Sequence, residues 1–195
     1  MKRTIVRLAY CTLALLLCVA FVELNAPLMA QKQAPPSDKP WQEVVSSEGR
    51  FRVLLPDTPD ETFLPFSAQI IHTEVRMFSV RRPEAFFAVL FGDYPNEARD
   101  PESIRQHFDN SRDRALAEGK LILVKEKEIG TANAPAREYV LDDGAFVYRA
   151  RLYYSKGILY ETIFGAPRLN QVSAGLVQYY DGLATKFLNS FKIGA

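Results

Sequence analysis

Apolar residues recur at every second position in the first part of the chain that we expect to fold. Phe51, Val53 and Leu55 follow this period, which is typical of a strand with one buried face. The segment WQEVVSSEGRFRVLLPDTP therefore predicts a hairpin whose turn lies at residues 47–49. Further strand patterns cover residues 68–81 and 85–92.

The hydrophobic period changes to that of a helix after residue 100. Asp100 is a favourable N-cap, Pro101 suits the first helical position, and Gly119 is a stop signal, so we expect a helix over 101–118. A second helix is predicted at 171–191, near the end of the chain. Its apolar stripe consists of Val172, Leu176, Tyr180, Leu183, Phe187 and Phe191.

Between these helices the pattern returns to strands. The predicted strands cover residues 120–129, 135–142, 145–154 and 158–165. Runs of adjacent strands with only two helices predict an α+β fold, in which a predominantly antiparallel and strongly twisted sheet is flanked by helices. The aromatic residues mostly fall on predicted buried faces, so we interpret them as core packing rather than as the lining of a ligand groove.

Two turns predict how the last strands pair. Asp143 and Gly144 suit a two-residue type I′ turn, and residues 155–157 suit a three-residue loop with Gly157 in the left-handed conformation. Both registers place opposite charges on one face of the sheet, so we interpret these charges as scaffold. The predicted cross-strand ion pairs are Glu138–Arg149 and Arg151–Glu161.

The N-terminal residues have the layout of a secretory signal peptide. Lys2, Arg3 and Arg7 precede an uncharged apolar run at residues 8–22, and small residues follow it. We expect residues 1–30 to be a signal peptide cleaved after Ala30. The alternative is a segment retained as a membrane anchor, which would be the only membrane contact we expect.

A polar, proline-containing stretch follows the signal peptide. The sequence QKQAPPSDKP, residues 31–40, predicts a disordered linker. The folded domain is then expected over residues 41–195, which is long enough to bury one sizeable core. The mature protein is therefore expected outside the cytoplasm, in the periplasm or secreted.

Composition excludes several classes of function. Both cysteines, Cys11 and Cys18, lie in the signal peptide, so the mature chain has neither a disulfide nor a thiol nucleophile. Removal of residues 1–30 takes three of the 24 basic residues and one of the 23 acidic residues, which leaves 21 basic and 22 acidic side chains. This balance disfavours a nucleic-acid partner and an anionic membrane surface.

Few residues are candidates for chemistry. Asp142 and Asp143 could form an acid–base pair, but adjacent strand residues point to opposite faces, which favours turn chemistry. His72 and His107 show no zinc-ligand spacing, so we interpret both as surface residues. The sequence also has no nucleophile elbow, no phosphate-binding loop and no dinucleotide fingerprint. We therefore predict no catalytic, cofactor-binding or metal-binding residue, and no cofactor.

A cluster of arginines leaves two interpretations open. Arg81 and Arg82 near a predicted strand end, with Arg50 and Arg52 earlier in the chain, could bind an anion. The alternative, which we favour, is a solvated strand edge whose charges discourage edge-to-edge aggregation.

The order of elements, together with the segments GRFRVLLPDTP and FLNSF, resembles the bacterial PsbP-like proteins. That family shares its fold with the extrinsic PsbP subunit of the oxygen-evolving complex and with a small Ran-binding nuclear protein of yeast. The resemblance covers about residues 41–193 and implies an α/β/α sandwich. No motif transfers a photosystem-binding or Ran-binding residue to this chain.

The resemblance also implies a class of function, because the known relatives bind other proteins and are not enzymes. We expect a non-catalytic protein-binding or scaffold module, whose partner is another extracytoplasmic protein. The alternative is a small-ligand-binding protein, or a hydrolase, with a pocket that no sequence motif marks.

Overall fold

The structure is a computed structural model. It describes residues 40–68, 71–93, 100–131, 134–168 and 174–194. The predicted signal peptide, and the predicted linker except for its last residue, lie outside the described residues. Both cysteines and Val172 also lie outside them.

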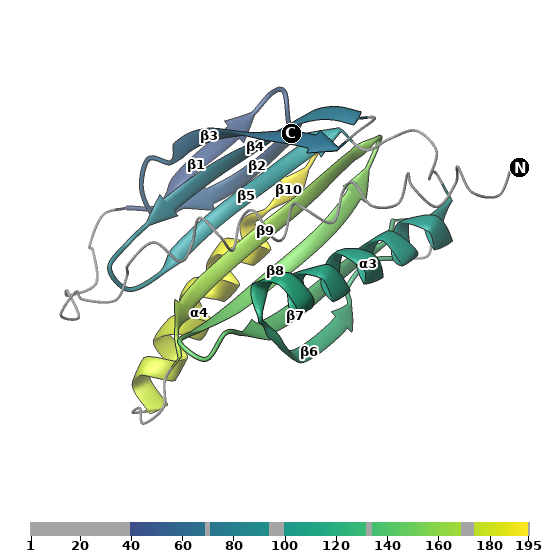
Figure 1. The fold of residues 1–195 in the computed structure, drawn as a ribbon. Coiled ribbons are helices and arrows are strands. Elements are labelled where there is room, and N and C mark those ends of the chain that lie inside the picture. Colours follow the sequence, from purple (N-terminus) through teal and green to yellow (C-terminus); the bar gives the residue numbers. More distant parts are fainter. Residues whose placement is uncertain (1–39, 69–70, 94–99, 132–133, 169–173, 195) are drawn as a thin grey trace, which may run out of the picture.

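A seven-stranded sheet forms the centre of the fold, with strand order β3-β4-β5-β9-β8-β7-β6 (Figure 1). Its strands are β3 (Asp60–Ala68), β4 (Ile71–Arg81), β5 (Phe86–Asp93), β6 (Ile122–Glu128), β7 (Ala136–Asp142), β8 (Phe146–Ser155) and β9 (Ile158–Pro167). Every neighbouring pair is antiparallel. The predicted α+β class with an antiparallel sheet is therefore confirmed.

A second, three-stranded sheet contains the first predicted hairpin. It consists of β1 (Gln42–Ser46), β2 (Phe51–Leu55) and β10 (Lys192–Ile193), in the order β1-β2-β10. The hairpin forms as predicted, with Val44 opposite Val53. The hydrophobic pattern does not predict β10, which pairs with the start of β2.

The two helices agree with their sequence signals. Asp100 caps α3 (Pro101–Gly119) by accepting a hydrogen bond from the Ser103 amide at 2.9 Å. The left-handed residue at the end of α3 is Lys120, with φ 52°, rather than Gly119. The second helix, α4 (Ala174–Ser190), ends where the Ser190 hydroxyl accepts a hydrogen bond from the Leu54 amide on β2.

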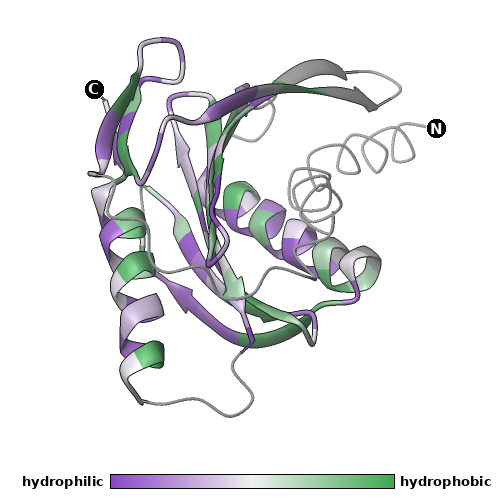
Figure 2. Cartoon of the chain, turned by 90° about the vertical axis from the view of Figure 1, so that its left-hand side faces the viewer, coloured by the Kyte–Doolittle hydropathy of each residue, from purple (hydrophilic) through white to green (hydrophobic). Residues whose placement is uncertain are grey.

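The elements form three layers. Figure 2 shows α3 on one side of the large sheet, with α4 and the three-stranded sheet on the other. One buried cluster lies on the α3 side and includes Ile104 and Phe108 of the helix. The other lies between the large sheet, the small sheet and α4, and holds most of the buried phenylalanines. The expected role of the aromatic residues in core packing is thus confirmed.

Strand β9 lies in the middle of the large sheet and is buried on both faces. All of its residues from Ile158 to Ala166 are buried. Leu159 and Ile163 belong to the α3-side cluster, whereas Tyr160 and Phe164 belong to the α4-side cluster. A strand buried on both faces reads as a nearly continuous apolar run, which is the pattern of this segment.

The β7–β8 turn lies one residue further along the chain than predicted. Asp143 and Phe146 flank the two central residues, Gly144 and Ala145, and the Asp143 amide donates to the Phe146 carbonyl at 3.2 Å. Gly144 has φ +92° and Ala145 has no positive φ, as in a type II′ turn. The predicted register is therefore wrong by two residues, although a shift of two leaves every side chain on its predicted face.

The β8–β9 turn differs from the prediction by one residue, which has a larger consequence. Lys156 and Gly157 both take positive φ values, 49° and 81°, and form a two-residue turn between Ser155 and Ile158. The predicted three-residue loop was wrong because Lys156 also adopts the left-handed conformation. Arg151 therefore pairs with Thr162. A slip of one residue places the side chains of β9 on the opposite faces from those predicted.

Substitution of Gly144 by valine should lower the free energy of unfolding by about 1–3 kcal/mol. A β-branched residue does not readily adopt φ +92°, and a Cβ at this position would meet no atom within 4 Å, so the cost comes from the backbone alone. Ala145→Val, at the exposed neighbouring position, is the control and should change stability by less than about 0.5 kcal/mol. Urea denaturation measures both changes. Equal losses in the two variants would contradict the assigned turn.

Candidate functional site

Asp142 and Asp143 build the β7–β8 turn. An Asp142 oxygen accepts from the Gly144 amide at 2.7 Å. One Asp143 oxygen accepts from the amides of Ala145 and Phe146, and the other accepts from the Tyr148 hydroxyl at 2.8 Å. The predicted turn role of the two carboxylates is therefore confirmed.

Three of the four charged residues predicted as partners do share the polar face of the sheet. Glu138 on β7 lies opposite Arg151 and accepts a hydrogen bond from its Nε atom. Its other oxygen lies 3.7 Å from Arg149. Arg151 also donates to the Leu188 carbonyl and to the Asn189 side chain, both near the end of α4. These contacts bind the sheet to α4.

Glu161, the fourth residue, lies on the other face of the sheet, so the predicted Arg151–Glu161 pair is wrong. A row of side chains crosses the α3 side, and Glu161 stands between Leu90 on β5 and Leu152 on β8. Along β9 its neighbours on the same face are Leu159 and Ile163. A carboxyl group is thus surrounded by four aliphatic side chains.

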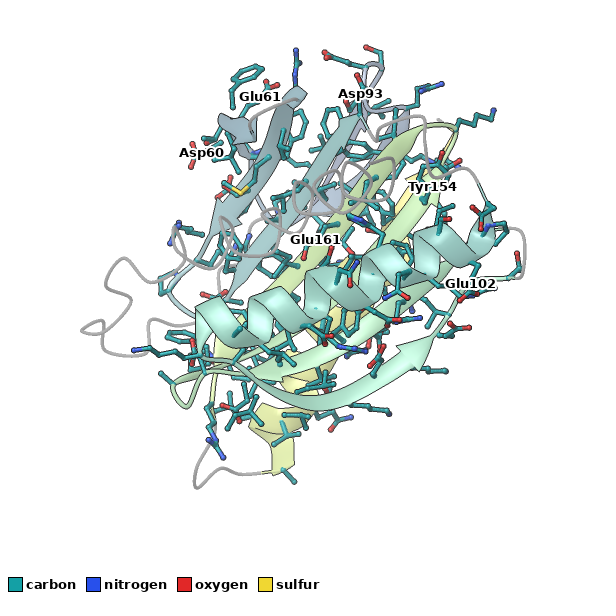
Figure 3. All side chains as sticks on the ribbon, turned by 45° about the vertical axis from the view of Figure 1, so that its right-hand side comes forward. Asp60, Glu61, Asp93, Glu102, Tyr154 and Glu161 are labelled. Atoms are coloured by element: carbon teal, nitrogen blue, oxygen red, sulfur yellow. The ribbon has the colours of Figure 1, made fainter. Side chains whose placement is uncertain are left out.

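Neither oxygen of Glu161 has a hydrogen-bond partner within the described part of the chain, and the residue is 2% exposed. Burial raises the pKa of Glu161 to about 8, because the apolar surroundings disfavour the charged form. The carboxyl is therefore mostly protonated at neutral pH. Figure 3 shows Glu161 on β9, beside α3.

Arg137, the cation in the same cross-strand row as Glu161, is already paired with other acidic side chains. Arg137 on β7 follows Leu152 in the row and therefore lies two strands from Glu161. Its guanidinium contacts Asp109 on α3, and it lies 2.9 Å from Glu126 and 3.1 Å from Glu128 on β6. This network joins α3 to the sheet.

The inner face of α3 also carries polar groups. His107 is 5% exposed and Ser111 is 2% exposed, and the two side chains lie 3.4 Å apart one helical turn from each other. Burial lowers the pKa of His107 to about 4, so its imidazole is neutral at physiological pH. The expectation that His107 is a surface residue is wrong. The side chain of His72 lies outside the described residues.

The arginines considered for an anion site have separate roles. Arg82 is 7% exposed, donates to the Pro56 carbonyl, and lies 3.9 Å from buried Glu84. It is therefore a buried link between the β4–β5 turn and the end of β2, not part of a solvated edge. Arg81 is exposed and lies over the ring of Phe86 at 5.2 Å.

An open cleft of about 530 Å³ lies near the end of α4, on the side of the large sheet opposite Glu161. Its lining residues are Ile129, Arg151, Tyr153, Leu188, Asn189, Phe191 and Lys192. The buried side chains of Leu188 and Phe191 provide an apolar floor, and exposed Asn189 and Lys192 provide polar groups around it. An apolar centre with a polar rim is the usual anatomy of a binding surface.

Two further findings concern metals and membranes. Within the described ranges, no group of three or more His, Cys, Asp and Glu side chains could hold a metal ion. The helices that the structure describes do not include one long and apolar enough to span a bilayer.

Comparison with known proteins shows the fold. Cyanobacterial PsbP from Synechocystis matches with a TM-score of 0.52 and 11% identity, over 84% of this chain and 98% of that one. This chain has a PsbP-like fold. A Pseudomonas aeruginosa protein of unknown function has a TM-score of 0.38 and 10% identity, over 74% of this chain and 91% of that one. No protein-family model and no curated protein sequence matches the chain.

Glu161 lies in a different environment from the one predicted from the sequence. A signal for its burial was present, because the segment ILYETIFG is apolar on both sides of Glu161. Such a run predicts a central strand buried on both faces, where a carboxyl has no solvent on either side. The predicted ion pair between Glu161 and Arg151 disagrees with this apolar run, and the apolar run indicates the environment correctly.

Proposed function

We propose that this chain is a non-catalytic module that binds another protein outside the cytoplasm. The PsbP-like fold supports the proposal, since the resemblance to PsbP-like proteins implies action by protein binding. The signal-peptide pattern of residues 1–30 supports the compartment. We also propose that the mature chain starts at Gln31.

The cleft near the end of α4 is the observation that carries the proposal. Lys192 offers an exposed positive charge, Asn189 offers an amide, and Tyr153 and Phe191 offer aromatic surface. Arginine and aromatic residues are enriched at protein interfaces. We infer that the cleft receives an acidic segment of the partner, which the exposed Lys192 attracts.

Affinity capture from the native cell envelope, followed by mass spectrometry, tests this function. The wild-type chain should recover a reproducible protein partner. Lys192→Glu reverses an exposed charge in the cleft and should reduce recovery at least tenfold, which corresponds to about 1.4 kcal/mol. N-terminal sequencing of the protein in the same fraction should begin at Gln31.

Lys125→Glu is the matched control, because it makes the same charge change at an exposed position on β6 outside the cleft. It should recover the partner as the wild type does. Equal recovery by the Lys192 variant would exclude the cleft, and the absence of any reproducible partner would exclude the function. An intact Met1 chain in the cytosol would contradict the compartment.

A small-ligand-binding function is the second candidate, and the environment of Glu161 favours it. A buried carboxyl with a raised pKa in an apolar layer is a common feature of binding and catalytic sites. This candidate involves the face of the sheet opposite the cleft, so both sites can coexist on one chain.

A further inference from the structure

Glu161 is an exception to the rule that buried polar groups are hydrogen-bonded. Both of its oxygens are buried without a hydrogen-bond partner in the described part of the chain. Glu161 lies at the centre of β9, and its neighbours on the same face of the sheet are aliphatic. Burial of such a group without a hydrogen bond costs on the order of 1–3 kcal/mol. A leucine or valine would suit this position better for stability alone, so the carboxyl requires another explanation.

The residues diagonal to Glu161 on the same face of the sheet are mostly small. Three of its four diagonal neighbours are small: Ala88 and Gly92 on β5, and Ala150 on β8. The fourth is Tyr154 on β8 (Figure 3). Small side chains at these positions limit how far the sheet surface rises around the carboxyl.

The helix on this side of the sheet is anchored away from β9. Its described polar contacts with the sheet go to β6 and β7, through Arg137, Tyr139, Glu126 and Glu128. Strand β9 lies two strand spacings from β7, which is roughly 10 Å. Glu161 is therefore displaced from the anchored part of α3, toward β5.

The chemistry of this layer selects the ligand. The side chains that flank Glu161 directly are aliphatic, so the body of a ligand must be apolar. A carboxyl whose oxygens both lack partners lacks hydrogen-bond donors, and an ammonium group supplies several of them together with the complementary charge. His107 does not compete for this role, because its imidazole is neutral at physiological pH.

We propose that the α3 side of β9 is a binding site for a small amphipathic amine, whose ammonium group pairs with Glu161 and whose apolar chain lies against Leu90, Leu152 and Ile163. The pairing moves one proton. The protonated carboxyl gives up its proton to solvent, and the resulting carboxylate binds the ammonium ion, which retains all of its own protons. The site rests on the second candidate function, small-ligand binding near Glu161, and is independent of the proposed protein partner, since it lies on the other face of the sheet from Lys192.

Isothermal titration calorimetry with octylamine, and with octanol as the uncharged analogue, tests the site on the full mature chain at about pH 7. The wild type should bind octylamine, and the heat should vary with the ionisation enthalpy of the buffer because close to one proton is released. Glu161→Gln should bind octylamine at least tenfold more weakly and release no proton. Octanol should bind both proteins equally weakly.

Thr162→Val is the matched control. Thr162 is the next residue on β9, is 0% exposed, and also has a buried oxygen without a hydrogen-bond partner in the described structure, but it points to the opposite face. This variant should bind octylamine and release a proton as the wild type does. Absence of octylamine binding, equal binding by Glu161→Gln, binding without proton release, or an equal loss in Thr162→Val would each overturn the proposal. None of these results bears on partner capture through Lys192.

Discussion

Glu161→Gln is expected to raise the free energy of unfolding at pH 8 by about 2–4 kcal/mol. The wild-type carboxyl must either remain protonated in the folded state or be ionised among Leu90, Leu152 and Ile163. Glutamine has nearly the same shape and cannot ionise. Its amide is also buried without a partner, so the gain should be smaller than the full pKa shift would give.

The sign of the pH dependence follows from the raised pKa. Burial raises the pKa of Glu161 from its ordinary value of 4.5 to about 8, so between these values the folded chain holds a proton that the unfolded chain has lost. The contribution of Glu161 to stability is therefore most favourable below pH 4.5 and is lost as the pH rises toward 8. The advantage of Glu161→Gln should be small at the acidic end and largest at the alkaline end.

Urea denaturation at several pH values measures this difference. Glu138→Gln is the matched control, because Glu138 is a partly buried strand carboxylate that accepts from Arg151. It should lower stability, since it weakens an ion pair. If Glu161→Gln were also destabilising, or if its advantage did not grow with pH, then Glu161 would have a partner that holds it ionised.

Hydrophobic periodicity was sufficient to predict most of the secondary structure. The first hairpin, both helices and the four strands after α3 lie within a few residues of their predicted positions. These elements have strong local signals, such as the alternation around Phe51 and the cap at Asp100. Strand β3 was not predicted, since Pro65 interrupts its pattern and its partner is the adjacent β4.

The separation into two sheets could not be predicted locally. Strand β10 has only two residues, and it pairs with Arg52 and Phe51, which lie about 140 positions earlier in the sequence. A two-residue strand has no detectable period. Its position is determined by α4, whose last residue, Ser190, is hydrogen-bonded to β2.

The environment of Glu161 could not be predicted from the turn sequence, because the conformation of the β8–β9 turn determines the register of the two strands. The sequence allows either a three-residue loop or a two-residue turn before Ile158, and the difference depends on the backbone conformation of Lys156. Lysine has no special preference for the left-handed conformation, so the residue type contained no warning. One residue of slip was enough to move Glu161 from the α4 side of the sheet, where Arg151 lies, to the aliphatic layer on the α3 side.

Phe51→Ala is expected to lower the free energy of unfolding by about 3–5 kcal/mol. Phe51 is fully buried on β2, and its ring lies 5.5 Å from that of Phe91 on β5 and 5.5 Å from that of Phe191 after α4. It also meets Phe78 on β4 and Tyr160 on β9, at 6.0 and 6.4 Å. One side chain thus joins the small sheet to three strands of the large sheet, and its removal leaves a cavity that these fixed strands cannot close.

Val45→Ala is the control for this loss, because Val45 is in the same small sheet and is 60% exposed. It should cost less than about 0.5 kcal/mol. Phe51→Leu should fall between the two, since leucine fills part of the cavity without the ring contacts. Urea denaturation gives all three values, and near-ultraviolet circular dichroism reports whether the aromatic cluster keeps its packing. If Phe51→Ala cost no more than Val45→Ala and left that spectrum unchanged, the small sheet would fold without support from Phe51, and the assigned packing between the two sheets would be wrong.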